Sequence, residues 1–115
     1  MKTNLRPLLP GVVLVSFLFI VGCSTTITPV GETTNEAVPV DQVEVFYQQP
    51  QRPYEVIALV SHEPGSVFPT VADCIAKCRQ AAAKAGADAL IVTATYGAAL
   101  GRPAKASGQA VKWKK

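Results

Sequence analysis

The sequence of 115 residues contains few of the residues and patterns on which catalytic sites depend. It has one histidine, one tryptophan and no methionine beyond Met1. No Gly-x-Ser-x-Gly elbow, Gly-rich phosphate loop or paired-carboxylate pattern occurs. Ser61-His62-Glu63 contains hydrolase residue types, but a triad needs side chains that converge in space, and consecutive residues at a strand end point in different directions. We therefore expect no catalytic residue, no cofactor and no enzymatic activity.

The chain also lacks an apolar run long enough to cross a membrane as a helix. The uncharged, mostly apolar run covers residues 11–21, whereas a spanning helix needs about 20 residues. Lys2 and Arg6 precede the run without any acid, which is typical of an export signal. The run ends in Ile20-Val21-Gly22-Cys23, which resembles a bacterial lipobox at all four positions. The resemblance implies that residues 1–22 are removed as a lipoprotein signal peptide and that Cys23 is lipidated.

The lipid anchor and the residue after it predict where the mature protein lies. One acyl chain anchors a protein only marginally, whereas the two or three chains of a bacterial lipoprotein, typically palmitate, hold it stably. Ser24 follows Cys23 where an Asp would favour retention at the inner membrane in Gram-negative bacteria. We therefore expect a protein anchored in the outer membrane, with its domain facing the periplasm.

Acidic residues are absent after Asp88, although the mature chain is close to neutral. Removal of residues 1–22 takes away only Lys2 and Arg6, so the formal charge falls from +3 to +1. The basic residues of the C-terminal part are Arg102, Lys105, Lys112, Lys114 and Lys115. They suit anionic lipid headgroups or an acidic partner, but we favour a solvated edge strand that lysines protect against aggregation. Nothing indicates nucleic-acid binding.

Cysteine is scarce, and the assignment of Cys23 to lipid leaves Cys74 and Cys78 as a pair. In an export compartment disulfides can persist. On a helix the two Cβ atoms would lie about 5–6 Å apart, whereas a disulfide needs about 3.5–4.5 Å. The alternatives are two buried thiols, a disulfide within the helix or between molecules, and a redox or metal role with His62. We favour buried thiols, place His62 in a surface loop and expect no metal site.

Hydrophobic periodicity predicts a small α+β domain with the element order β-β-α-β-β. The expected elements are strands at 43–47, 54–61, 89–96 and 109–114 and a helix at 71–85. Thr70 and Asp73 predict a capping box, and Gly86 predicts a left-handed helix end. The stretch from Ser24 to Val40 is rich in threonine, with proline and glycine, and predicts a flexible tether. The expected division is a signal peptide at 1–22, a lipidated N-terminus and tether at 23–41, and a domain at 42–115, a four-stranded sheet with one helix packed on one face.

Three stretches carry a resemblance to a known group of proteins. They are Tyr54-Glu55-Val56-Ile57, Ala85-Gly86-Ala87-Asp88-Ala89-Leu90 and Ala106-Ser107-Gly108-Gln109-Ala110-Val111. These stretches resemble small bacterial outer-membrane lipoproteins of largely unknown function, and the layout over residues 43–114 is similar to the sensor lipoprotein of the Rcs envelope-stress system. The resemblance implies a fold and an envelope location rather than an activity. That sensor has four cysteines in two disulfides, whereas this chain has two besides Cys23.

We therefore expect a non-enzymatic, membrane-anchored lipoprotein whose domain binds another envelope component or serves structurally. Gly97, Leu100, Gly101 and Arg102 form the candidate partner interface, because exposed apolar loops seldom lack a reason. The aromatic residues are a further candidate patch: Phe46, Tyr47, Tyr54, Tyr96 and Trp113. The alternative function is an envelope-stress, redox or metal sensor that uses Cys74 and Cys78. Nothing in the sequence specifies an oligomeric state.

Overall fold

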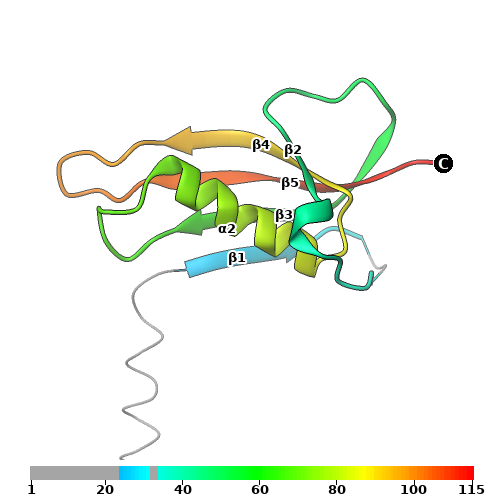
Figure 1. Cartoon of the computed structure of the whole chain (residues 1–115), viewed down its shortest axis with the longest axis horizontal. Coiled ribbons are helices and arrows are strands. Elements are labelled where there is room, and N and C mark those ends of the chain that lie inside the picture. Colours follow the sequence, from blue (N-terminus) through cyan, green and yellow to red (C-terminus); the bar gives the residue numbers. More distant parts are fainter. Residues whose placement is uncertain (1–23, 32–33) are drawn as a thin grey trace, which may run out of the picture.

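One helix packs against a five-stranded mixed sheet in the computed structural model, which describes residues 24–31 and 34–115 (Figure 1). The sheet order is β1-β3-β5-β4-β2. The elements are β1 (Ser24–Pro29), a short 3-10 helix η2 (Val40–Gln42), β2 (Glu44–Phe46), β3 (Tyr54–Glu63), α2 (Val71–Lys84), β4 (Ala89–Tyr96) and β5 (Lys105–Trp113). The α+β prediction is confirmed, with five strands where four were expected. The predicted signal peptide and Cys23 lie outside the described residues.

The additional strand, β1, lies inside the stretch that was predicted to be a flexible tether. Ser24–Pro29 pairs antiparallel with β3 along the edge of the sheet, from Ser24 opposite Glu63 to Pro29 opposite Ala58. Threonine and isoleucine are β-branched and favour a pleated, half-buried surface, so Thr-Thr-Ile-Thr suits an edge strand. The tether prediction is therefore wrong for residues 24–29.

The central strand of the sheet is β5, although its lysines had suggested an edge strand. It pairs antiparallel with β3 on one side and with β4 on the other, and it begins at residue 105 rather than 109. Small residues explain its position, because a Cβ on Gly108 would lie 2.5 Å from the carbonyl oxygen of Ile91. Since both neighbours are antiparallel to β5, β3 and β4 run in the same direction, and α2 connects them.

The helix α2 begins and ends where its local signals predicted. Thr70 and Asp73 form a complete capping box, in which the Thr70 amide donates to Asp73 Oδ2 at 2.8 Å. Ala85 is the C-cap, and Gly86 follows with φ of +82°. A Cβ on Gly86 would also lie 2.5 Å from the Cβ of Asn35. The capping box and the left-handed helix end are therefore confirmed.

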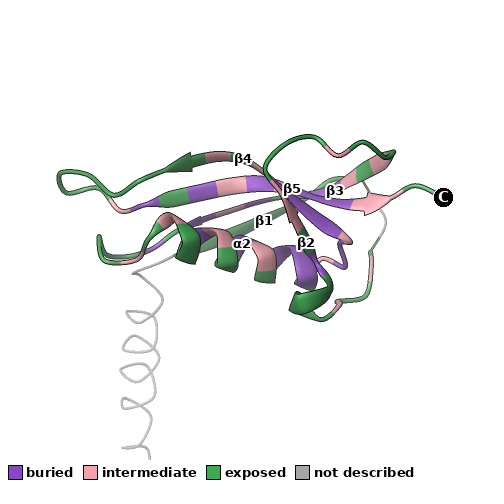
Figure 2. Ribbon diagram, turned by 45° about the horizontal axis from the view of Figure 1, so that its top comes forward, coloured by how far each residue is buried: buried purple, intermediate pink, exposed green. Residues whose placement is uncertain are grey.

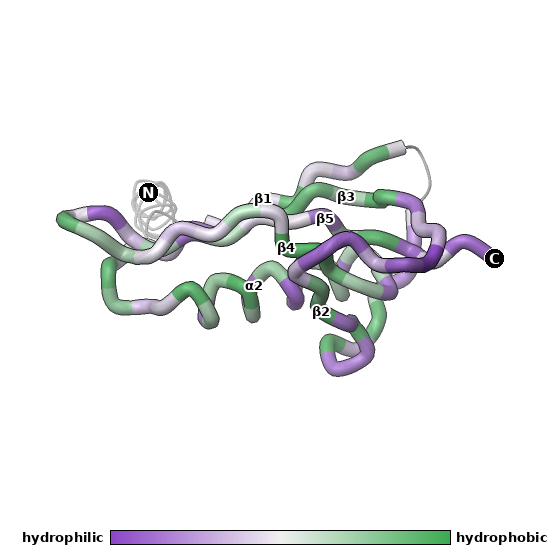
Figure 3. The backbone as a smooth tube through the Cα atoms, turned by 90° about the horizontal axis from the view of Figure 1, so that it is seen from above, coloured by the Kyte–Doolittle hydropathy of each residue, from purple (hydrophilic) through white to green (hydrophobic). Residues whose placement is uncertain are grey.

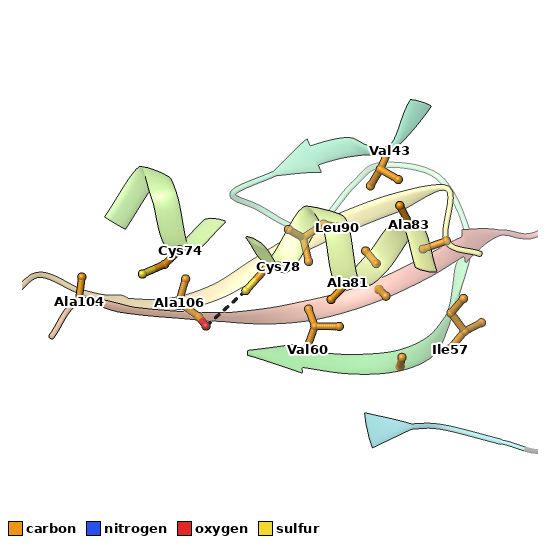
Figure 4. Packing of buried hydrophobic residues seen from close by; sticks show 14 residues of the cluster. Val43, Ile57, Val60, Cys74, Cys78, Ala81, Ala83, Leu90, Ala104 and Ala106 are labelled. Carbon is orange, nitrogen blue, oxygen red and sulfur yellow. Dashed lines mark hydrogen bonds between the residues drawn. The ribbon is translucent and has the colours of Figure 1, made fainter. Parts of the chain in front are cut away.

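The main core lies between α2 and the sheet (Figures 2 and 4). Alanines from the helix meet Val60 of β3, Leu90 of β4 and the alanines of β5. Arg79 of α2 holds the segment between η2 and β2 against the helix, because its Nε donates to the carbonyl oxygen of Val43 at 2.7 Å. Small side chains on both surfaces allow the helix to lie close to the sheet.

A smaller cluster covers one end of the opposite face of the sheet. Val111 and Ile91 pack there with Phe46, Tyr54 and Trp113. A bulge between Val56 and Ala58 breaks the predicted alternation of β3, so that Ile57 joins Ala58 in the main core.

Candidate functional site

The loop between β4 and β5 is a tight hairpin with an apolar tip. Ala99 and Arg102 form an isolated antiparallel bridge, in which the Ala99 amide donates to the Arg102 carbonyl at 3.1 Å. Gly101 has φ of +77°, a conformation that glycine adopts without steric cost. Leu100 stands between the bridged residues and is fully exposed. The turn therefore holds a large apolar side chain in solvent.

An open hollow of about 990 Å³ lies beside this hairpin. It brings together three of the predicted interface residues, Gly97, Leu100 and Arg102, while Gly101 shapes the turn. The hollow is also lined by Glu63, Thr95, Tyr96, Ala99, Pro103 and Lys105. Sequence reasoning missed Glu63 and Lys105, because their meeting depends on the pairing of β3 with β5.

A second loop, residues 64–70, projects from the same end of the sheet (Figures 1 and 3). It contains Val67 and Phe68, and the Phe68 side chain is 87% exposed. The capping box at Thr70 fixes the end of this loop to the start of α2. Sequence reasoning missed both residues. The signal that could have revealed them is a Val-Phe pair between turn residues, immediately before the helix cap at Thr70.

The first residue of β1 lies at this same end. A row of paired residues crosses four strands from Thr25 through His62 and Ala106 to Thr95. One residue beyond this row, Ser24 lies opposite Glu63, and Tyr96 lies opposite Lys105. We call this end of the sheet, with the loops 64–70 and 97–104, the loop end. The C-terminus lies at the other end (Figure 1).

His62 is a buried strand residue, so its prediction as a surface loop residue is wrong. β3 continues beyond the expected end at Ser61, and His62 is 6% exposed. Its Nδ1 lies 2.6 Å from the hydroxyl oxygen of Thr25. Burial lowers the pKa of His62, and the positive charge of Lys77 on α2 lowers it further. The side chain is therefore a neutral, hydrogen-bonded link between β1 and β3.

Cys74 and Cys78 are free thiols buried on the sheet-facing side of α2 (Figure 4). The Cys78 thiol donates to the carbonyl oxygen of Ala106 at 3.4 Å. Burial, with a smaller effect from Cys74, raises the pKa of Cys78 to about 11. Burial also raises the pKa of Cys74, and the carboxylate of Asp73 adds to it. The structure contains no disulfide between them, and thiols of this kind form little reactive thiolate at neutral pH.

The side chains considered for the alternative metal role, Cys74, Cys78 and His62, do not form a metal site. Across residues 24–31 and 34–115, no group of three His, Cys, Asp or Glu side chains is placed to hold a metal ion. Within the same ranges, no helix has the length and apolar character needed to span a membrane.

The predicted aromatic patch is divided between two ends of the sheet. Trp113 lies at the end away from the loops, with the Phe46 ring edge-on at 5.7 Å and the Arg52 guanidinium 4.2 Å from its ring centre. Tyr96 lies at the loop end and is exposed. Tyr47 is also exposed, outside the Trp113 cluster. The aromatic residues therefore do not form one binding surface.

Comparisons with known proteins identify the fold and no family. No protein-family model matches the chain, and no curated protein matches it. Among solved structures, the chain is similar to a Francisella virulence factor, FvfA, with a TM-score of 0.60 and 15% sequence identity. The match covers 76% of this chain and 96% of the other. At this identity the likeness concerns the fold alone.

Proposed function

We propose that the mature protein is a lipoprotein of the bacterial outer membrane, anchored through Cys23, with a non-enzymatic domain that faces the periplasm and contacts another envelope component. The lipobox-like Ile20-Val21-Gly22-Cys23 supports the anchor. The observation that carries the proposal is the position of Ser24. The strand β1 starts at Ser24, one residue after the proposed lipidation site, at the end of the sheet that exposes Leu100.

A binding or structural role fits the surface better than catalysis does. The loop end exposes Phe68, Tyr96 and Leu100, whereas the hydrogen-bonded His62 is buried and engaged by Thr25. Exposed apolar side chains gathered at one end of a small domain are typical of interaction sites. The proposed domain therefore acts by contact rather than by chemistry.

Substitution of the anchor tests the proposal. Wild-type protein should incorporate labelled palmitate and sediment with outer membranes, whereas Cys23→Ser should lose both properties. Cys74→Ser serves as the matched control, because it removes a buried thiol and leaves the lipobox intact. Unchanged acylation and fractionation of Cys23→Ser would refute the lipid anchor.

The alternative proposal, an envelope-stress, redox or metal sensor, rests on Cys74 and Cys78. Their burial and raised pKa values favour a packing role, because a reactive cysteine needs thiolate character and access. A sensor would require that serine at either position changes a stress response by more than the loss of stability accounts for.

A further inference from the structure

Three segments that are distant in the sequence lie at the loop end. They are the start of β1 at Ser24, the loop with Phe68 and the hairpin with Leu100. The two loops can be followed in Figures 1 and 3. Both apolar side chains are largely or fully exposed. Large exposed apolar side chains on a small domain generally mark a contact surface. The position of Ser24 indicates which surface this is.

The proposed anchor, Cys23, directly precedes the first paired residue of the sheet. Ser24 is already paired with Glu63, and the Cα of Cys23 is covalently held about 3.8 Å from that of Ser24. If Cys23 carries the lipid, as the proposed function states, the loop end lies next to the headgroups. A tether of 17 residues would have allowed the domain to stand away from the membrane, but six of those residues are in β1.

The hairpin between β4 and β5 extends far enough beyond Ser24 to cross the headgroup layer. Tyr96 and Glu63 both lie one residue beyond the row that joins His62 to Ala106 and Thr95. Leu100 follows Tyr96 by four residues, so it lies at most about 13 Å beyond the level of Ser24, at about 3.3 Å per residue. The headgroup layer of one leaflet is about 5–7 Å thick. The hairpin tip can therefore reach the boundary between headgroups and acyl chains.

The charges around the hairpin suit a phosphate-bearing surface. Arg102 and Lys105 line the hollow beside Leu100, against one acid, Glu63. A guanidinium can bind phosphate through two parallel hydrogen bonds, and basic residues close to a membrane surface are attracted to anionic lipids. An apolar tip beside basic side chains is the pattern expected at a lipid interface.

We infer that the loop end rests on the membrane that holds the lipid anchor. Leu100 and Phe68 enter the boundary between headgroups and acyl chains, and Arg102 and Lys105 contact lipid phosphates. The sheet stands on the membrane, and the end at which the C-terminus of the chain lies is directed away from it. The envelope component that the loop contacts is thus the lipid surface itself.

Depth-dependent quenching on the full lipidated protein tests this inference. The protein is reconstituted into vesicles of phosphatidylethanolamine and phosphatidylglycerol, with the fluorophore NBD on Leu100→Cys, Phe68→Cys or Lys115→Cys. Lys115 is the matched control at the far end, and protein without an added cysteine reports any labelling of Cys74 and Cys78. NBD at 100 and 68 should emit at shorter wavelength and be quenched by acyl-chain spin labels, whereas NBD at 115 should behave as in water.

The outcomes separate this inference from the proposed function. Intact mass spectrometry first establishes whether Cys23 carries acyl chains, and their absence would refute the anchor and the docking together. Acylated, vesicle-bound protein with equal, water-like emission at 100, 68 and 115 would refute the docking alone. The same result together with a photocrosslink in cells from position 100 to a protein would assign the loop to a protein partner. Arg102→Glu with Lys105→Glu should reduce the quenching at 100, and unchanged quenching would refute the phosphate contacts.

Discussion

The hydroxyl of Thr25 lies 2.6 Å from Nδ1 of His62, and this contact joins the edge strand β1 to β3. Thr25 is separated from the proposed lipidation site, Cys23, by Ser24 alone. A buried imidazole nitrogen without a partner is costly, so this side-chain pair helps to hold β1 in place. The contact therefore links the stability of the domain to the position of the anchor.

Removal of the Thr25 hydroxyl should destabilise the protein although the β-branched shape is kept. We expect Thr25→Val to cost about 1–2 kcal/mol of unfolding free energy, because Nδ1 of His62 loses its partner in a buried site. Thr26→Val is the matched control on the opposite face of the same strand, and it should change stability by less than about 0.5 kcal/mol. Urea titrations of the purified protein measure both. Equal effects at the two positions would show that the hydroxyl of Thr25 has no special role.

Acid should weaken the fold through His62 before the carboxylates titrate. Burial and Lys77 lower the native pKa of His62, so the unfolded chain, with a pKa of about 6.5, binds the proton more readily than the folded one. Stability should therefore fall as the pH drops below about 6.5, and this loss should end once the lowered native pKa is passed. Carboxyl groups ordinarily titrate below about pH 5, so a slope measured above that pH reports mainly on His62. Urea midpoints between pH 5 and 7.5 measure the slope, which His62→Gln should remove; a slope retained in that variant would contradict the assignment.

The two remaining cysteines should react slowly until the protein unfolds. With the pKa of Cys78 at about 11, its thiolate fraction at pH 8 is roughly a hundredfold below that of an ordinary thiol. Alkylation with iodoacetamide, read by mass spectrometry, should be at least that much slower in the native state than in denaturant. Rapid native labelling would indicate an accessible thiol, and resistance in denaturant without reductant would indicate a disulfide.

Local signals in the sequence predicted those features of the fold that depend on neighbours in the chain. Thr70 and Asp73 are three residues apart, and Gly86 follows the last apolar turn, so the bounds of α2 could be read directly. The apolar run 89–96 likewise predicted β4 with its correct bounds. In each case the residues that decide the structure lie close together in the sequence.

The errors concern pairings between distant segments. Nothing near Ser24–Pro29 shows that a free edge of β3 is available to it, and Thr-rich sequence suits either a strand or a tether. β5 was taken for an edge strand because the order of strands in a sheet depends on non-local contacts. His62 was misplaced because β3 continues to pair beyond Ser61, with both β1 and β5. The loop end depends on the pairing of β1, β3 and β5, so no single stretch of the sequence predicts it.

Gly86 should be far less tolerant of a side chain than Gly97, although both follow a secondary-structure element. Gly86 has φ of +82°, and an added Cβ would meet the Cβ of Asn35 and the carbonyl oxygen of Glu36, each at 2.5 Å. A left-handed backbone costs a residue with a Cβ about 1–2 kcal/mol, and the two contacts add to that. We expect Gly86→Ala to lower the unfolding free energy by about 2 kcal/mol or more. Gly97→Ala, where nothing lies within 4 Å of the added Cβ, should change it by less than about 0.5 kcal/mol. Thermal and urea unfolding of the two variants measure the difference. Because Asn35 and Glu36 precede η2 and β2, equal stabilities would mean that the segment before β2 does not pack on the helix end.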